Sequence, residues 1–104
     1  MTQKDKIDRL SAVARRVLPE DGEAWLFGSQ ARGTSRPDSD WDVLVLLGKE
    51  SLSHTDFGTY AYPFIEEGWD IDAMVSPILL TKNDWEASSF TPFYKNVVND
   101  RIAL

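Results

Sequence analysis

The first half of the chain combines one helical and two strand-like hydrophobic patterns. Apolar residues recur at helical spacing and predict an amphipathic helix over residues 3–18, ended by Pro19 and Gly22. Residues 23–27 then form a short apolar run that is typical of a buried strand. After a loop rich in Gly, Ser and Pro, residues 40–47 form a second strand of β-branched and apolar side chains.

Two carboxylates lie at the start of the second of these strands. Because side chains alternate between the faces of a strand, Asp40 and Asp42 share one face, about 6 to 7 Å apart along the backbone, while Trp41 points into packing on the other. Two negative charges on one face repel each other, and burial raises the free-energy cost of keeping both carboxylates ionised. A divalent cation bound between them removes this cost. Mg²⁺ usually takes one or two carboxylates with water and substrate phosphates. Two such ions, about 3.5 to 4 Å apart, can hold the attacking and leaving oxygens of a phosphoryl transfer.

A third acid would complete such a site. Residues 69–75 alternate between acidic and apolar positions, which predicts a third strand with Trp69 on its apolar, packed face. Asp70 and Asp72 would then share the more open face. We favour Asp72 as the third acid because it lies nearer the centre of this strand, with Asp70 as the fallback.

A Gly-Ser pair stands where the first strand ends. Gly28 permits a positive φ and close approach of a ligand to the backbone. Ser29 can cap the following turn or bind a phosphate oxygen, and the N–H groups of that turn suit an anion. Arg32 and Arg36 bring positive charge to the same loop, and Arg holds phosphate oxygens in a two-point contact. A candidate phosphate cradle therefore lies beside the candidate metal pair.

The remaining elements complete an α/β (α+β) pattern. We predict a helix over residues 53–68, bent or interrupted at Pro63, and a final helix that Thr91 and Pro92 start and that runs to about residue 100. We expect residues 1–104 to form a single domain, a small mixed sheet with helices packed mainly on one face and the metal site on the opposite face. The order of the strands stays open.

Composition narrows the class of protein. Hydrophobic residues make up 42% and charged residues 27% of the chain, as in ordinary globular domains. A net charge of −6 argues against general nucleic-acid binding, which usually needs a basic face, and fits a metal site or a basic partner protein. The absence of cysteine excludes disulfides and thiolate zinc sites. The first ten residues are too polar for a secretory signal and no apolar stretch has the length of a membrane span, so we expect a cytoplasmic protein.

The stretch GSQARGTSRPDSDWDVLVLL, in which ten residues separate Gly-Ser from Asp-x-Asp, resembles the nucleotidyltransferase superfamily that includes the polymerase β palm. It resembles most closely the minimal, or MNT-type, nucleotidyltransferases, over most of the chain. The resemblance implies the nucleotidyltransferase fold and Mg²⁺-dependent transfer of a nucleoside monophosphate, with AMP from ATP as the first choice, to an acceptor hydroxyl. It implies that Gly28 and Ser29 contact the triphosphate, that Asp40 and Asp42 bind metal, and that Asp72 is the third acid. From its place in the same loop, we expect Arg32 to hold phosphates as well.

Many MNT proteins are antitoxins paired with a HEPN-domain toxin, and some add AMP to a tyrosine of that partner. The resemblance therefore implies a HEPN-type protein as partner and acceptor. The chain lacks the helical domain that antibiotic-modifying relatives carry after the catalytic domain, which counts against a stand-alone small-molecule enzyme.

Other functions stay open beside this one. The first is a binding module that neutralises a partner by complex formation, with weak or absent catalysis. The second is nucleotidylation of a small molecule in a pocket built between subunits of an oligomer. A calcium loop starting at Asp38 is excluded, because Val43 and Lys49 stand where such loops need Gly and Glu.

Overall fold

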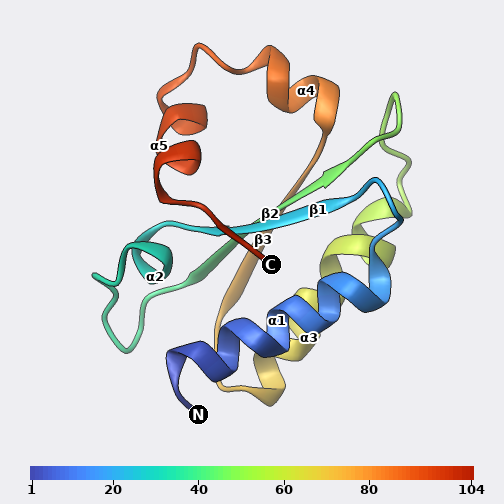
Figure 1. Cartoon of the computed structure of the whole chain (residues 1–104). Coiled ribbons are helices and arrows are strands. Elements are labelled where there is room, and N and C mark those ends of the chain that lie inside the picture. The colour runs from blue at the N-terminus through green and yellow to red at the C-terminus, as the bar shows by residue number, and fades with distance from the viewer.

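A four-stranded mixed sheet forms the centre of the molecule (Figure 1), in the order β3-β2-β1-β4. The computed structural model describes all residues, 1–104. β1 (Glu23–Phe27) pairs antiparallel with β2 (Trp41–Leu47), and β2 pairs parallel with β3 (Val75–Thr81). β4 (Ile102–Ala103) adds a short antiparallel edge beside β1. The strands predicted over residues 23–27 and 40–47 are thus confirmed, the second beginning one residue later.

Helices cover the two faces of the sheet unequally. The longer helices, α1 (Gln3–Val17) and α3 (Tyr62–Asp70), lie side by side on one face. The shorter α4 (Lys82–Ala87) and α5 (Pro92–Asp100) lie over part of the other face, as Figure 1 shows. The mixed sheet and the preference for one face agree with the sequence-based prediction. Two hydrophobic clusters, one on each face, hold these layers together.

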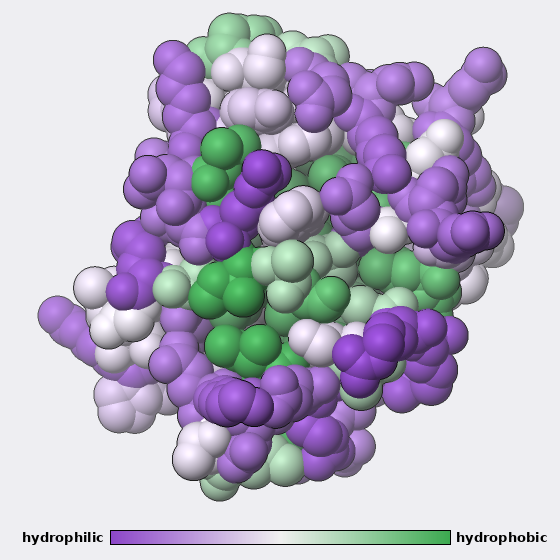
Figure 2. Space-filling view, in the orientation of Figure 1, coloured by the Kyte–Doolittle hydropathy of each residue, from purple (hydrophilic) through white to green (hydrophobic).

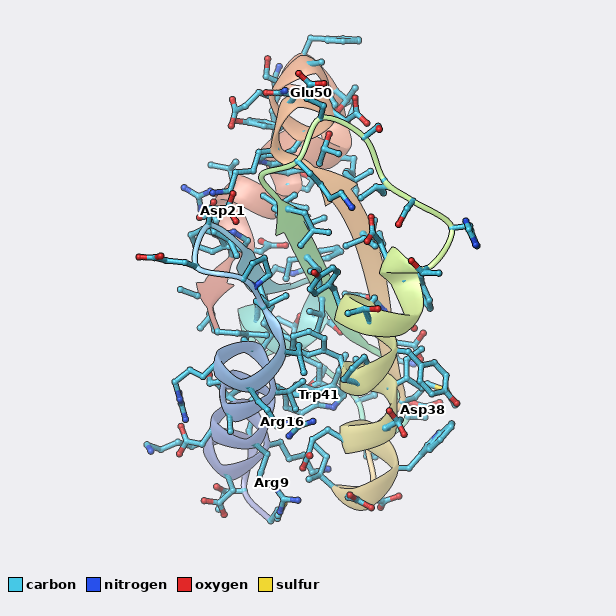
Figure 3. All side chains as sticks on the ribbon, turned by 90° about the vertical axis from the view of Figure 1, so that its right-hand side faces the viewer. Arg9, Arg16, Asp21, Asp38, Trp41 and Glu50 are labelled. Carbon is cyan, nitrogen blue, oxygen red and sulfur yellow. The ribbon has the colours of Figure 1, made fainter.

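The larger cluster lies between the sheet and the α1–α3 layer. Alternation along β2 sends every second side chain into it, including Trp41, which lies between α1 and α3 in Figure 3 and is 5% exposed. The side chains that fill this cluster include Leu10, Val13, Leu26, Val43, Val45 and Phe64. The smaller cluster, on the opposite face, contains Leu44, Leu46, Trp85 and Val97. Asp42 has the same parity as Leu44, so its side chain belongs to the α4–α5 face.

α1 begins at the predicted residue and ends one residue before the predicted end. Thr2 and Asp5 form a capping box, in which the Thr2 hydroxyl accepts from the Asp5 N–H and the Asp5 carboxylate accepts from the Thr2 N–H. Leu18 is extended, as expected for the residue before Pro19. The final helix is likewise confirmed, with the Thr91 hydroxyl accepting from the Tyr94 N–H at 3.2 Å.

The helix predicted over residues 53–68 forms in a different way. A π-helical segment, η1 (Phe57–Ala61), precedes α3, and Pro63 lies in the first turn of α3. Of the two predicted effects of Pro63, the structure therefore shows an interruption rather than a bend within one helix. Gly68 does not end the helix. It is buried, and a Cβ at this position would lie 2.5 Å from the Ala73 carbonyl oxygen, so Gly68 serves close packing against the following chain.

The strand predicted over residues 69–75 is wrong. Trp69 and Asp70 complete α3, the next residues turn, and Trp69 is 67% exposed rather than packed. The third strand is instead β3. Its sequence did not predict a strand, because Pro77 lies inside the segment. Proline is tolerated there because β3 is an edge strand.

The surface seen in the orientation of Figure 1 is mostly hydrophilic. Figure 2 shows apolar residues gathered near the middle of this face, with charged and polar residues around them. No helix of the structure has both the length and the apolar character that crossing a membrane requires.

Candidate active site

Gly28 ends β1 in a conformation that only glycine adopts without strain. Its φ is +78° and its ψ is −160°, and its carbonyl accepts hydrogen bonds from the N–H groups of Ala31 at 3.1 Å and Arg32 at 3.0 Å. These bonds wind the next residues into the short helix α2 (Ser29–Arg32), as the sequence predicted. Ser29 is half-buried at the start of this turn.

The carboxylate of Asp42 lies directly over Gly28. In the antiparallel register Phe27 pairs with Asp42, which brings the end of β1 against the start of β2. A Cβ added to Gly28 would overlap the Asp42 Oδ2 atom. Glycine is therefore needed here for both its backbone conformation and its missing side chain, and the candidate phosphate cradle adjoins the candidate metal pair.

Asp40 and Asp42 form an acidic pair at the start of β2. Asp40 is exposed and Asp42 is partly buried. Burial, followed by the charge of Asp40, raises the pKa of Asp42, while the positive charge of Arg32 acts in the opposite direction. Ionisation of Asp42 is therefore unfavourable in this position, and a bound cation would stabilise the ionised pair.

Arg32 forms an ion pair with α5 and lies near enough to the acidic pair for its charge to act on Asp42. Its Nη1 atom lies 2.6 Å from Oδ2 of Asp100, whose side chain is only 6% exposed, while half of the Arg32 side chain stays in solvent. The sequence predicted Arg32 as a phosphate ligand but gave no sign of Asp100, which comes from the last turn of α5. Arg32 is therefore held beside Asp42 by an anchor far along the chain.

Asp72 does not join the acidic pair. It lies in the turn between α3 and β3, with a left-handed φ of +55°, and its carbonyl accepts a hydrogen bond from the Lys6 ammonium at 3.2 Å. No group of three or more His, Asp or Glu side chains in the chain is close enough to hold a metal ion. The expected three-acid site, with Asp72 or Asp70 as its third member, is therefore not present. The physical reason is that α3 continues through Asp70, so these residues never enter the sheet.

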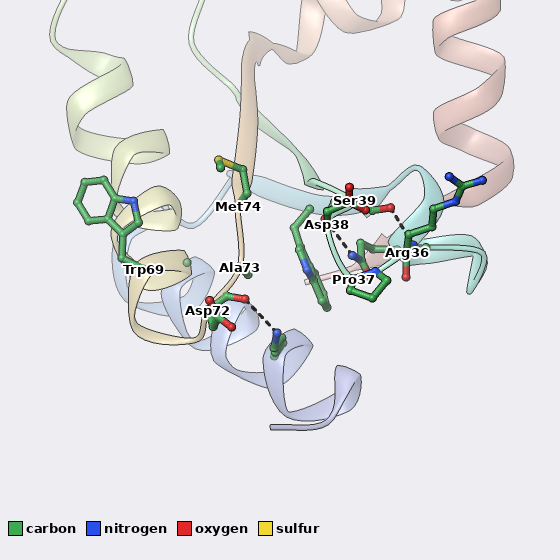
Figure 4. A pocket seen from close by; sticks show the side chains of 13 residues that line it. Arg36, Pro37, Asp38, Ser39, Trp69, Asp72, Ala73 and Met74 are labelled. Atoms are coloured by element: carbon green, nitrogen blue, oxygen red, sulfur yellow. Dashed lines mark hydrogen bonds between the residues drawn. The ribbon is translucent and has the colours of Figure 1, made fainter.

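Asp72 instead lines a separate open cavity of about 700 Å³. Figure 4 shows Asp72, Ala73 and Met74 on one side of this cavity and residues 36–39 on the other. Its floor includes Trp41, whose side chain projects from the face of β2 opposite to Asp42. The cavity and the acidic pair therefore open on different sides of the same strand.

Ser76 is a neighbour of the acidic pair that sequence reasoning missed. In the parallel register of β2 and β3, Ser76 pairs with Asp42. Its hydroxyl donates a hydrogen bond to Oδ2 of Asp40 at 3.1 Å. The apolar run at residues 75–81 could have predicted this strand, but Pro77 within it argued against a strand.

The donors at the start of β2 fit a divalent cation of the Mg²⁺ type. Asp40 and Asp42 offer oxygen ligands on one face, burial and then the charge of Asp40 raise the pKa of Asp42, and the missing side chain of Gly28 lets the Asp42 carboxylate lie against the turn. Such ions accept one or two carboxylates and complete their shell with water and phosphates. The fit holds for one ion, and the structure supplies no third carboxylate for a second.

Known structures share this fold. A toxin–antitoxin structure with AMP-PNP matches 92% of this chain and 69% of that chain, with 22% identity and a TM-score of 0.64. A complex of a tri-AMPylated Shewanella oneidensis HEPN toxin with an MNT antitoxin matches 98% and 71%, with 20% identity and a TM-score of 0.62. A putative nucleotidyltransferase from Sulfolobus solfataricus matches 97% and 80%, with 22% identity and a TM-score of 0.60.

Sequence comparison agrees with the fold. Curated protein sequences give no significant match to this chain. The family model of the nucleotidyltransferase domain, however, matches residues 7–103, nearly the whole chain, including the Gly-Ser turn and both aspartates. This chain therefore belongs to the nucleotidyltransferase domain family.

Proposed function

We propose that this chain transfers a nucleoside monophosphate, AMP from ATP in the first instance, to an acceptor hydroxyl. The main support for this proposal is the position of the Asp42 carboxylate over Gly28, with Asp40 on the same face. This arrangement would put a triphosphate on the Gly28 turn within reach of the acidic pair. In the transfer, the acceptor oxygen forms a bond to the α-phosphorus as the bond to pyrophosphate breaks.

The residues of the turn would hold the phosphates. N–H groups at the start of a helix lack partners within the helix and suit anionic oxygens, and the Ser29 hydroxyl can add a further donor. Arg32 has half of its side chain in solvent and lies near Asp42, so its guanidinium can contact a phosphate at the same edge. Gly28 has no side chain of its own, so the Asp42 carboxylate can lie against the turn that would hold the phosphates.

Asp40 and Asp42 would hold Mg²⁺ together with phosphate oxygens and water. The bound ion would supply positive charge to the transferred phosphate and to the departing pyrophosphate. Asp42 would fix where that charge sits, because it belongs to a strand that is hydrogen-bonded on both sides, and Asp40 immediately precedes this strand. The proposal does not use Asp72, which faces the separate cavity.

The acceptor in this proposal belongs to a HEPN-type toxin, and the chain acts as its antitoxin in the cytoplasm. Support comes from the toxin–antitoxin complexes that share the fold, one of which contains an AMPylated HEPN toxin. The net charge of −6 suits a basic partner. Large apolar side chains stand exposed, including Trp69, Met74 and Phe90, as expected for a chain that binds another protein.

The test is transfer of label from α-labelled ATP, in Mg²⁺, to the HEPN-type protein proposed as the partner. We expect a mass gain of one or more AMP units on that protein. The double variant Asp40→Asn with Asp42→Asn should lose the transfer while the complex still forms. Asp38→Asn, an exposed loop position two residues earlier, is the matched control and should retain it.

A binding module without catalysis is the second candidate, and the missing third carboxylate favours it. It predicts a different result in the same experiment. The double variant would then neutralise the toxin as well as the unchanged chain does, and no nucleotide would label the partner.

A further inference from the structure

Ser76 occupies the place on β3 where the acidic pair is open to a third neighbour. β3 runs parallel to β2, and the register sets Ser76 beside Asp42. The Ser76 side chain shares a face with the pair, and its hydroxyl donates to Oδ2 of Asp40 at 3.1 Å. Ser76 is half-buried between the two strands and the solvent.

This hydrogen bond restrains a carboxylate that has few other restraints. Asp40 precedes β2, outside the ladder, and is exposed. A donor on Oδ2 leaves Oδ1 available to a cation and limits rotation of the carboxylate. Because a hydroxyl is neutral, it can order Asp40 without adding negative charge to the pair.

We propose that Ser76 is a positioning residue for a divalent-cation site at Asp40 and Asp42, and that it takes the position where a third carboxylate could stand. The inference rests on the proposed function, since it assumes that this pair binds a cation. It differs from the three-acid expectation because the third partner is a hydroxyl from β3. Groups that hydrogen-bond to metal ligands commonly change metal affinity by about 10–100-fold when they are removed.

A purely structural role for Ser76 makes a different prediction. In that case the hydrogen bond would only tie the start of β2 to the edge strand, and its loss would lower thermal stability without changing cation affinity. Cation affinity of the metal-free chain is therefore the informative measurement, and the thermal midpoint is its companion. Mn²⁺ is a suitable probe because it shares the oxygen ligands of Mg²⁺.

The experiment titrates Mn²⁺ alone into the full chain, with free ion followed by electron paramagnetic resonance. We expect Ser76→Ala to weaken binding about tenfold or more. Ser76→Thr keeps the hydroxyl and suits a strand, so it should restore most of the affinity. Ser76→Asp adds a third carboxylate and should bind Mn²⁺ more tightly than the unchanged chain. Ser89→Ala, at an exposed serine between α4 and α5, is the matched control.

The outcomes separate this inference from the function on which it rests. If Asp42→Asn abolishes Mn²⁺ binding while Ser76→Ala and Ser76→Asp both match the unchanged chain, the role of Ser76 is wrong and the proposed site stands. If the unchanged chain binds no Mn²⁺, the proposed metal site is wrong and the role of Ser76 falls with it. A loss in Ser76→Ala, restored in Ser76→Thr and exceeded in Ser76→Asp, supports both.

Discussion

The space that a side chain would need at Gly28 is filled by the carboxylate of Asp42. A Cβ at Gly28 would overlap Asp42 Oδ2, and the φ of Gly28, +78°, independently disfavours any other residue. The two residues are fourteen positions apart in sequence, and the antiparallel register of β1 and β2 joins them. The Gly-Ser and Asp-x-Asp parts of the motif are therefore one contact rather than two neighbouring features.

Gly28→Ala is expected to damage both stability and the site. The backbone strain alone costs about 1–3 kcal/mol of the free energy of unfolding, and the new methyl group must displace Asp42. Urea denaturation measures the first effect and Mn²⁺ affinity the second. Gly33→Ala is the matched control, because Gly33 also has a positive φ, +76°, but open space around it. It should cost about 1 kcal/mol and leave Mn²⁺ binding intact. Equal loss of Mn²⁺ binding in both variants would argue against the contact.

Asp42→Asn is expected to stabilise the metal-free chain at neutral pH. Burial and Asp40 raise the pKa of Asp42 above 3.8, so the native state binds this proton more tightly than the unfolded state does. Stability therefore falls as the pH rises from 3.8 through the raised pKa, and the variant avoids that loss. Denaturation of both chains in the presence of a chelator, from below pH 3.8 to neutral pH, measures this difference in stability.

The same profile contains its own controls. Below pH 3.8 the carboxylate is protonated in both states, and the advantage of Asp42→Asn should disappear. Added Mg²⁺ should stabilise the unchanged chain but not the variant, because only the former keeps both carboxylates. A metal-free unchanged chain that is more stable than the variant at neutral pH would contradict this account of Asp42.

Arg32 is expected to have a structural role and a nucleotide-binding role that can be separated. Arg32→Met leaves the nearly buried Asp100 carboxylate without its partner, which should cost about 1–3 kcal/mol of stability and also weaken ATP binding. Adding Asp100→Asn should restore much of the stability but not the ATP affinity. Thermal denaturation and calorimetric ATP titration measure the two roles. Recovery of ATP binding in the double variant would show that Arg32 does not contact the nucleotide.

The elements that sequence predicted well are those specified by local patterns. The helix at residues 3–18 has its own cap and apolar face, and the strands around Gly28 and Asp42 have clear apolar runs. The conformation of the Gly28 turn could be predicted for the same reason, since a strand exit with Gly-Ser favours a positive φ and a short helical turn. The fold class followed from the succession of these elements together with the family resemblance.

The features that sequence missed depend on tertiary contacts. Residues 69–75 alternate like a strand, but Gly68 is a packing position rather than a helix end, and α3 runs on to Asp70. Ser76 and Asp100 reach the site only through the β2–β3 register and the docking of α5. The local sequence around Ser76 and around Asp100 does not predict those contacts.

Asp72 is expected to behave as a turn residue. Its φ of +55° is a conformation that Asn adopts readily, so Asp72→Asn should fold as well as the unchanged chain and bind Mn²⁺ equally. Asp72→Ala should lose about 1 kcal/mol, because alanine tolerates the left-handed region less well. Denaturation and Mn²⁺ titration of both variants measure this. Loss of Mn²⁺ binding in Asp72→Asn would restore Asp72 as a metal ligand.

The most direct test of the central claim is a crystal structure with Mn²⁺ and a non-hydrolysable ATP analogue, in which anomalous scattering locates the ion. The account predicts Mn²⁺ between Asp40 and Asp42, with the triphosphate on the turn at Gly28 and Ser29. An ion or nucleotide found instead in the cavity beside Asp72, with Asp40 and Asp42 free of both, would contradict it.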